Sequence, residues 1–214
     1  MKIKLSGLML IMCLVMATEV YAQELSPSTR AAYDAFVHMV SAISGGSTSK
    51  LREAVKEMRN CPLKDFSTLI PLQDDLSLDG HLVFTESFAL AVIEGKDCYR
   101  MAQKYHEESN TRTISSEAVV FYKTCLAPAH GSVKYMFFAK GSQDIAVVAE
   151  PGGLLSMRIH DLTHEKWYND TEDVRKGRPE RTMVLPIPDN EDCRLEIEII
   201  NTCNKDKSFV ILCN

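Results

Sequence analysis

The residues whose types and spacing best suit chemistry lie between positions 160 and 165. Two histidines and two carboxylates stand together in the segment HDLTHE, and further acidic residues follow at positions 170, 172 and 173. Imidazole nitrogens and carboxylate oxygens are ligands for zinc or calcium. One hypothesis is therefore a divalent metal site whose ligands are His160, Asp161, His164 and Glu165.

The alternative for this segment is a solvated loop between two strands. Leu155, Met157 and Ile159 alternate as in a strand, which places His160 at the end of that strand. The four-residue spacing of His160 and His164 would suit one face of a helix, and it has no such meaning in a loop. Charged residues collect in loops without binding a ligand.

Two aromatic residues follow the histidines and suggest a second kind of site. Trp167 is the only tryptophan of the chain, and Tyr168 follows it. Aromatic ring faces suit the apolar faces of sugars, so Trp167 and Tyr168 are the predicted ligand-binding residues, as a platform for a glycan. The alternative is a half-buried lid over the domain, since large aromatic residues are mostly buried.

Other segments resemble catalytic motifs but lack an essential part. The segment EPGG at 150–153 lacks the Gly-x-x-x-x-Gly-Lys pattern of a phosphate loop and predicts a turn between strands. Cys125 lies near His130, but no third residue marks an oriented nucleophile and base. No serine stands in a Gly-x-Ser-x-Gly motif. The sequence therefore predicts no catalytic residue and no cofactor.

The first 22 residues have the order of a secretory signal peptide. Lys2 and Lys4 precede an apolar run over 5–17, and the small-x-small pattern Val20-Tyr21-Ala22 precedes Gln23. The run is shorter than the ~20 apolar residues that span a bilayer, so no transmembrane segment is expected after cleavage. The protein is predicted to be secreted or periplasmic.

The net charge argues against two classes of partner. Cleavage after residue 22 would leave 214 − 22 = 192 residues, and it would remove two lysines and one glutamate. The remaining 22 basic and 28 acidic residues give a net charge of −6. This balance argues against nucleic acid and against an electrostatic membrane surface as partners.

Six cysteines lie beyond the signal peptide: Cys61, Cys98, Cys125, Cys193, Cys203 and Cys213. An even number in an exported chain predicts disulfide bonds, although the 15 complete pairings cannot be distinguished from sequence. If 195–201 and 208–213 form a hairpin, Cys193 and Cys213 lie close together at its open end. Buried free thiols are the alternative.

The hydrophobic pattern changes its period near residue 115. Before it, three-to-four spacing predicts a helix between the start signal Ser26-Pro27-Ser28 and the stop signal Gly45-Gly46. A second helix is expected after the Ser47-Thr48-Ser49 cluster, and two more over 86–93 and 97–108. Beyond it, apolar residues alternate in seven short runs, of which Arg194–Ile199 is the clearest. We therefore expect an α+β protein with a signal peptide at 1–22, a short helical N-terminal region at 23–114 and an antiparallel β-sandwich at 115–214.

The stretch from Ser132 to Asn214 resembles a known family of small secreted modules. The aromatic strand at 133–141 (VKYMFFAKG), the strand at 144–150 and the strand at 154–161 are similar to those of the bacterial pre-peptidase C-terminal domain. The resemblance implies a jelly-roll-like accessory module without chemistry of its own. The whole chain resembles uncharacterised secreted proteins of Gram-negative bacteria that carry such a sandwich.

Two functions are consistent with these features. The first is a non-enzymatic secreted or envelope protein whose sandwich binds a protein or a glycan. The second is a metal-assisted hydrolase that uses the loop between His160 and His164. The signal peptide, the strand pattern and the incomplete catalytic motifs favour the first, and enzymatic activity is accordingly not expected.

Overall fold

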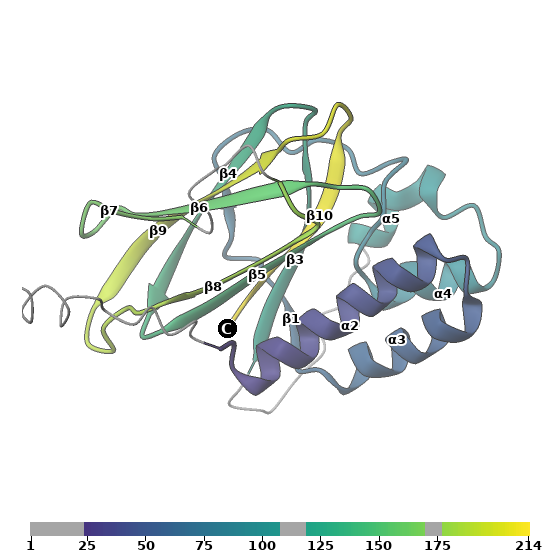
Figure 1. The fold of residues 1–214 in the computed structure, drawn as a ribbon, viewed down its shortest axis with the longest axis horizontal. Helices are drawn as coiled ribbons and strands as arrows, with labels where there is room; N and C mark the ends of the chain where they lie inside the picture. Colours follow the sequence, from purple (N-terminus) through teal and green to yellow (C-terminus); the bar gives the residue numbers. More distant parts are fainter. Residues whose placement is uncertain (1–23, 108–118, 170–176) are drawn as a thin grey trace, which may run out of the picture.

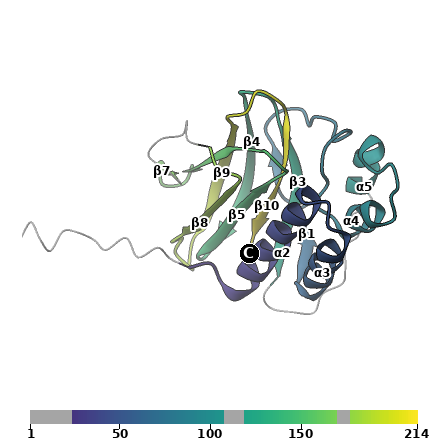
Figure 2. The same ribbon diagram turned by 45° about the vertical axis from the view of Figure 1, so that its right-hand side comes forward.

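The molecule is built in three layers: a layer of helices and two β-sheets. The computed structural model describes residues 24–107, 119–169 and 177–214, and in this part of the chain ten strands form two five-stranded sheets. Helices cover one face of the first sheet, and the second sheet packs against its other face (Figures 1 and 2). The predicted α+β fold with a sandwich-like arrangement is confirmed. The predicted signal peptide lies outside the described residues.

Two long helices begin the described chain as the sequence predicts. Helix α2 spans Pro27–Ser44 and α3 spans Thr48–Asn60. Between them Gly46 has a φ of +62°, a backbone conformation that glycine adopts without strain. The hydroxyl of Ser47 accepts a hydrogen bond from the backbone N–H of Lys50 and caps α3.

A second helical segment follows after a connector. Helix α4 spans Glu86–Ile93 and is capped by Thr85, whose hydroxyl accepts a hydrogen bond from the backbone N–H of Phe88. The predicted helix over 97–108 is in fact a 3₁₀ turn, η1 (Tyr99–Met101), followed by α5 (Ala102–Glu107). In the part of the chain that the structure describes, no helix is long and apolar enough to cross a membrane.

The two sheets differ in their surroundings. The inner sheet lies between the helices and the other sheet, and its strand order is β1 (Leu63–Asp65), β3 (Val120–Ala127), β10 (Lys207–Cys213), β5 (Gln143–Ala149) and β8 (Glu180–Leu185). The outer sheet has the order β2 (Ile70–Pro71), β4 (Ser132–Lys140), β9 (Asp192–Asn201), β6 (Leu155–Asp161) and β7 (Lys166–Asn169). Strands β1 and β3 run parallel, and all the other pairs are antiparallel.

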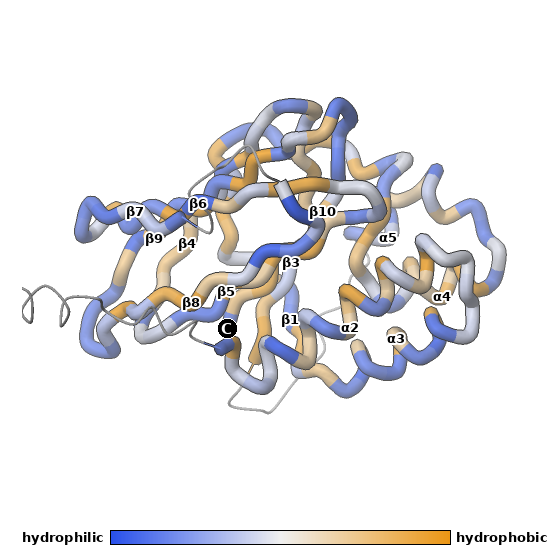
Figure 3. Tube along the Cα trace, in the orientation of Figure 1, coloured by the Kyte–Doolittle hydropathy of each residue, from blue (hydrophilic) through white to orange (hydrophobic). Residues whose placement is uncertain are grey.

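Alternating residues of the inner sheet enter two different hydrophobic layers. On β10, Phe209 and Ile211 face the outer sheet, whereas Val210 and Leu212 face the helices. A strand that is covered on both faces is a near-continuous apolar run. In the outer sheet, β4 alternates strictly between buried and more exposed residues, and β6 and β9 alternate over most of their length, because their second face is open. Figure 3 shows the apolar residues along the strands and the helix faces, with hydrophilic residues in the connecting loops.

The expected disulfide bonds are not present. All six cysteines of the described residues are free. The proposed hairpin between β9 and β10 does not form, because β9 belongs to the outer sheet and β10 to the inner sheet. Cys193 and Cys213 therefore lie on facing sheets instead of at the open end of one hairpin.

Candidate functional site

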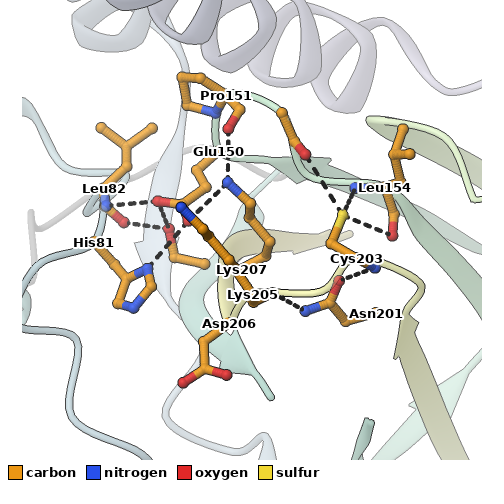
Figure 4. Close-up of polar contacts among 12 residues, drawn as sticks. His81, Leu82, Glu150, Pro151, Leu154, Asn201, Cys203, Lys205, Asp206 and Lys207 are labelled. Carbon is orange, nitrogen blue, oxygen red and sulfur yellow. Dashed lines mark hydrogen bonds and ion pairs between the residues drawn. The ribbon is translucent and has the colours of Figure 1, made fainter. Parts of the chain in front are cut away.

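A cleft lies where the segment before α4, the turn η1 and the loop between β9 and β10 come together. Its volume is about 620 Å³. Seven of its eleven lining residues have polar or charged side chains, and the lining residues are Gly80, His81, Leu82, Tyr99, Ala129, Glu150, Pro151, Asn204, Lys205, Asp206 and Lys207. We call it the Glu150 cleft, after the buried carboxylate in its wall (Figure 4).

Glu150 connects three segments that are distant in sequence. Its Oε1 lies 3.1 Å from Nδ1 of His81 and 3.6 Å from Nζ of Lys207. Its Oε2 accepts the backbone N–H of Leu82 at 3.1 Å. The hydroxyl of Ser208 lies 3.1 Å from Oε2 and 2.7 Å from the carbonyl oxygen of Leu82. The side chain is 8% exposed, so its charge is compensated almost entirely by these groups.

These contacts keep Glu150 ionised. Burial on its own disfavours the charged form, but the hydrogen bonds from His81 and from the N–H of Leu82 outweigh burial. The charges of His81 and Lys207 add to them, and the pKa of Glu150 lies below its usual value. The carboxylate is therefore a fixed structural anion and is poorly suited to act as a general acid near neutral pH.

The rim of the cleft offers an aromatic ring and exposed polar groups. Tyr99 is 36% exposed, and the ring of Phe88 meets it at an interplanar angle of 85° with the centroids 5.1 Å apart. Oδ1 of Asp206, which also lines the cleft, accepts the backbone N–H of Ala129 at 2.8 Å, which fixes that carboxylate. The neighbouring Lys205 is exposed.

Asn201 holds the loop that carries these polar groups. Its Nδ2 donates to the carbonyl oxygens of Ala127, Pro128 and Lys205 at 3.1, 3.1 and 2.8 Å. Its Oδ1 accepts the backbone N–H of Cys203 at 2.9 Å. The side chain is buried, so one amide group satisfies several backbone groups at the loop's base (Figure 4).

The predicted metal-binding segment forms the end of β6 and the turn to β7. Its four predicted ligands do not come together in one site. Asp161 and His164 come together, with Oδ2 of Asp161 2.7 Å from Nδ1 of His164. Glu165 is exposed in the turn and has a φ of +53°. His160 is paired with Trp167 across the two strands, and their rings stack at 4.2 Å between centroids.

The aromatic pair predicted to form one platform is divided in the same way. Trp167 and Tyr168 are neighbours on β7 and so point to opposite faces of the sheet. Trp167 is 46% exposed, and the guanidinium of Arg158 lies 5.4 Å from its ring. Tyr168 packs against the core between the sheets.

Two residues that the sequence did not suggest complete the Asp161–His164 pair. Sγ of Cys193, on β9, lies 3.8 Å from Nδ1 of His164, and Oε2 of Glu191 lies 2.9 Å from Nε2. They are 29 and 27 residues away from His164 in sequence, and only the pairing of β6 with β9 brings them close. The acidic residues at 170, 172 and 173 lie outside the described residues.

The electrostatics of this cluster follow from its hydrogen bonds. The bond to Asp161, followed by the bond to Glu191, raises the pKa of His164. Burial opposes the ionised form of Asp161, but its bonds from His164 and Thr163 outweigh burial and lower its pKa. Burial raises the pKa of Cys193. Both carboxylates thus favour the protonated form of His164.

The weaker motifs have structural roles. The segment 150–153 connects β5 to β6, as predicted, and Gly152 has a φ of +72°. A Cβ on Gly153 would lie 2.6 Å from Cβ of Ala149, so no larger residue fits. Cys125 is buried in β3, and burial raises the pKa of its thiol to about 12, which is contrary to an activated nucleophile.

No protein-family model and no curated protein matches the chain. Among solved structures, it is similar to the mitogen derived from Yersinia pseudotuberculosis, with 8% identity over 44% of this chain and 84% of that chain and a TM-score of 0.34. It is similar to the periplasmic inhibitor of g-type lysozyme from Salmonella Typhimurium, with 13% identity over 48% and 93% and a TM-score of 0.31. A pre-peptidase C-terminal domain of collagenase from Bacillus anthracis has 13% identity over 43% and 88% and a TM-score of 0.30. The last belongs to the family that the sequence resembles, and the likeness is a distant one of fold.

Proposed function

We propose that this chain is an exported, non-enzymatic binding protein that holds a short glycan in the Glu150 cleft. The observation that carries the proposal is the cleft of about 620 Å³, whose walls combine apolar surface with polar side chains and one exposed aromatic ring. Sites for small ligands have volumes of roughly 300–1,000 Å³. The cleft thus suits a few sugar rings better than the flat surface of a protein partner.

The groups at the rim match what a sugar requires. A pyranose ring has an apolar face that packs on an aromatic ring, and its edge carries hydroxyl groups that both donate and accept. Tyr99 supplies the ring and is held in place by Phe88. Asp206 supplies a carboxylate and Lys205 an ammonium group in the same lining. Export is supported by the predicted signal peptide at 1–22.

The chemistry of the wall favours binding over turnover. A general acid needs a pKa near the working pH, and that of Glu150 is lowered by its partners. Its two oxygens are occupied by His81, Leu82 and Lys207, which leaves no open position for a reacting group. A rigid, compensated wall of this kind supports a preorganised binding site.

Calorimetric titration of the purified protein with a panel of neutral and acidic oligosaccharides tests the proposal. We expect Tyr99→Ala to lower the affinity for the oligosaccharide that binds by roughly two- to twelvefold. This factor is the equivalent of an aromatic contact of about 0.5–1.5 kcal/mol. Asp206→Asn should weaken it as well. Trp167→Ala is the matched control, because it removes an exposed aromatic ring of the outer sheet.

Two outcomes would contradict the proposal. If no oligosaccharide binds, the cleft does not serve a glycan. If Trp167→Ala abolishes binding and Tyr99→Ala leaves it unchanged, the glycan lies on the outer sheet, and the sequence-based assignment to Trp167 replaces the cleft.

A further inference from the structure

We propose that Asp161, His164 and Cys193 bind a divalent transition-metal ion of the zinc class, with Glu191 orienting the histidine. The ligand atoms are Oδ2 of Asp161, Nδ1 of His164 and Sγ of Cys193. They all lie within 4.8 Å of one another. This inference is independent of the glycan cleft.

The distances permit a tetrahedral ion with small adjustments. Sγ of Cys193 and Nδ1 of His164 are 3.8 Å apart. Zn–S and Zn–N bonds of ~2.3 and ~2.1 Å then give an angle of about 120° at the metal, close to tetrahedral. Oδ2 of Asp161 lies 2.7 Å from Nδ1, and this distance has to widen to about 3.4 Å. The exposed side chain of His164 has the freedom to make that movement.

Groups around the three ligands already hold them in the necessary orientation. A metal-binding histidine usually donates its second ring N–H to a carboxylate, which fixes the tautomer. Glu191 accepts from Nε2 of His164 at 2.9 Å and leaves Nδ1 for the metal. The backbone N–H groups of Thr163 and His164 donate to Oδ1 of Asp161 at 2.9 and 3.1 Å, and they leave Oδ2 directed at the histidine.

The backbone around the cluster is fixed by strand pairing. Asp161 is opposite Leu195 in the register of β6 and β9. Beyond this pair, the N–H of Leu162 donates to the carbonyl oxygen of Arg194, whose own N–H donates to the hydroxyl of Thr163. The turn that carries His164 is therefore tied to the strand that carries Cys193.

The donor set selects the class of ion. One thiolate, one imidazole and one carboxylate suit zinc and its softer neighbours, whereas calcium and magnesium prefer oxygen ligands alone. Three protein ligands leave a fourth position, and the exposure of His164 directs it to solvent. Sites with three ligands and an open position hold a water molecule or an exogenous ligand there.

The contacts have a second explanation that needs no metal. An imidazolium between Asp161 and Glu191 accounts for both bonds of His164. It gives the thiol of Cys193 no polar role, since Cys193 would then be only a core residue whose sulfur lies 3.8 Å from the nitrogen that bonds Asp161. The role of Cys193 therefore separates the two explanations.

Competition titration of the purified protein with Zn²⁺, together with absorption spectra after Co²⁺ addition, tests the proposal. We expect one equivalent of metal and a thiolate-to-cobalt charge-transfer band. His164→Gln and Cys193→Ser should each abolish both signals. Glu191→Gln should weaken the affinity roughly 10- to 100-fold, as for other partners of metal-bound histidines.

Matched controls come from the same chain. His160→Gln changes the nearby histidine on the outward face of β6, and Cys203→Ser changes a less buried thiol. Both should retain one equivalent of metal and the band. Circular dichroism checks that Cys193→Ser is folded. If Cys193→Ser is not folded, His164→Gln decides the test, because the side chain of His164 is exposed.

Three results would overturn the proposal. The first is the absence of stoichiometric binding. The second is binding that persists in His164→Gln, which marks an adventitious ion only. The third is a band that disappears in Cys203→Ser and survives in Cys193→Ser. None of these results bears on glycan binding, which is tested by other residues.

Discussion

Replacing Glu150 with alanine is expected to lower the free energy of unfolding by about 3–5 kcal/mol, the usual cost of removing one partner from a buried ion pair. The substitution leaves Lys207 without its counter-charge, and it leaves His81 and the N–H of Leu82 without their hydrogen-bond partner. For a domain of this size, the change corresponds to a fall in Tm of roughly 6–20 °C.

Glu150→Gln separates the charge from the shape of the side chain. The amide keeps one oxygen for the N–H of Leu82 but loses the charge that faces His81 and Lys207. Hydrogen bonds to charged groups contribute about 1.5–3 kcal/mol, so we expect a loss within that range. Urea unfolding followed by circular dichroism measures both variants. Glu53→Gln on the exposed face of α3 is the control and should stay within about 0.5 kcal/mol.

The effect of pH on this difference has a definite sign. The pKa of Glu150 is lower in the folded protein than its usual value, so its stabilisation is fully present above about pH 4.5. The stabilisation is lost as the pH falls through the folded pKa. The gap in stability between the wild type and Glu150→Gln should therefore shrink as the pH falls from about 4.5 toward 3. A gap that grows toward pH 3, or a cost near that of Glu53→Gln, would refute the role given to this carboxylate.

Three further predictions concern the core, the loop and the thiols. Phe209→Ala, at a fully buried ring between the sheets, should cost about 3–5 kcal/mol in urea unfolding. Phe138→Ala, at a ring that is 66% exposed, should lower the free energy of unfolding by less than about 0.5 kcal/mol. Equal losses for Phe209→Ala and Phe138→Ala would contradict the assignment of the core. Asn201→Ala should cost about 1–3 kcal/mol or more, because several buried backbone groups lose their partner; a neutral result would show that water replaces the amide. Reductant should leave the Tm unchanged, and all six described cysteines should react with a thiol reagent in denaturant without prior reduction; fewer reactive thiols would contradict the free state.

Much of the architecture is predictable from local pattern. Helices α2 and α4 have the boundaries that the three-to-four spacing and the capping residues indicate. The strict alternation at 194–199 correctly predicts which residues of β9 face the core. Local signals suffice here because each element has one buried face and clear ends.

Other parts of the fold depend on long-range pairing and could not be predicted. Strands β1 and β2 have three and two residues, too few for any period to be visible. The four exposed or half-exposed residues of β7 show no alternation of burial. On β10, the positions between the predicted inward residues are also apolar: they are Val210 and Leu212. Both are buried because the helices pack on this second face of the inner sheet.

The site residues follow the same division. Asp161 and His164 are close because they lie three residues apart in one turn, and the sequence suggested this pair. The partners of Glu150 are 57 to 69 residues away, and Cys193 is 29 residues from His164. Only the order of strands brings these groups together, and a single sequence contains no signal for that order.

The final strand of the described chain, β10, lies between β3 and β5 at the centre of the inner sheet. Until β10 inserts, β3 and β5 have unpaired backbone edges, and both hydrophobic layers lack the buried side chains of β10. A ribosome-bound chain that still lacks this segment therefore cannot fold stepwise from its helices onward, and it remains prone to aggregation. Assembly is expected to be a late and concerted event, governed by contacts between distant parts of the polypeptide.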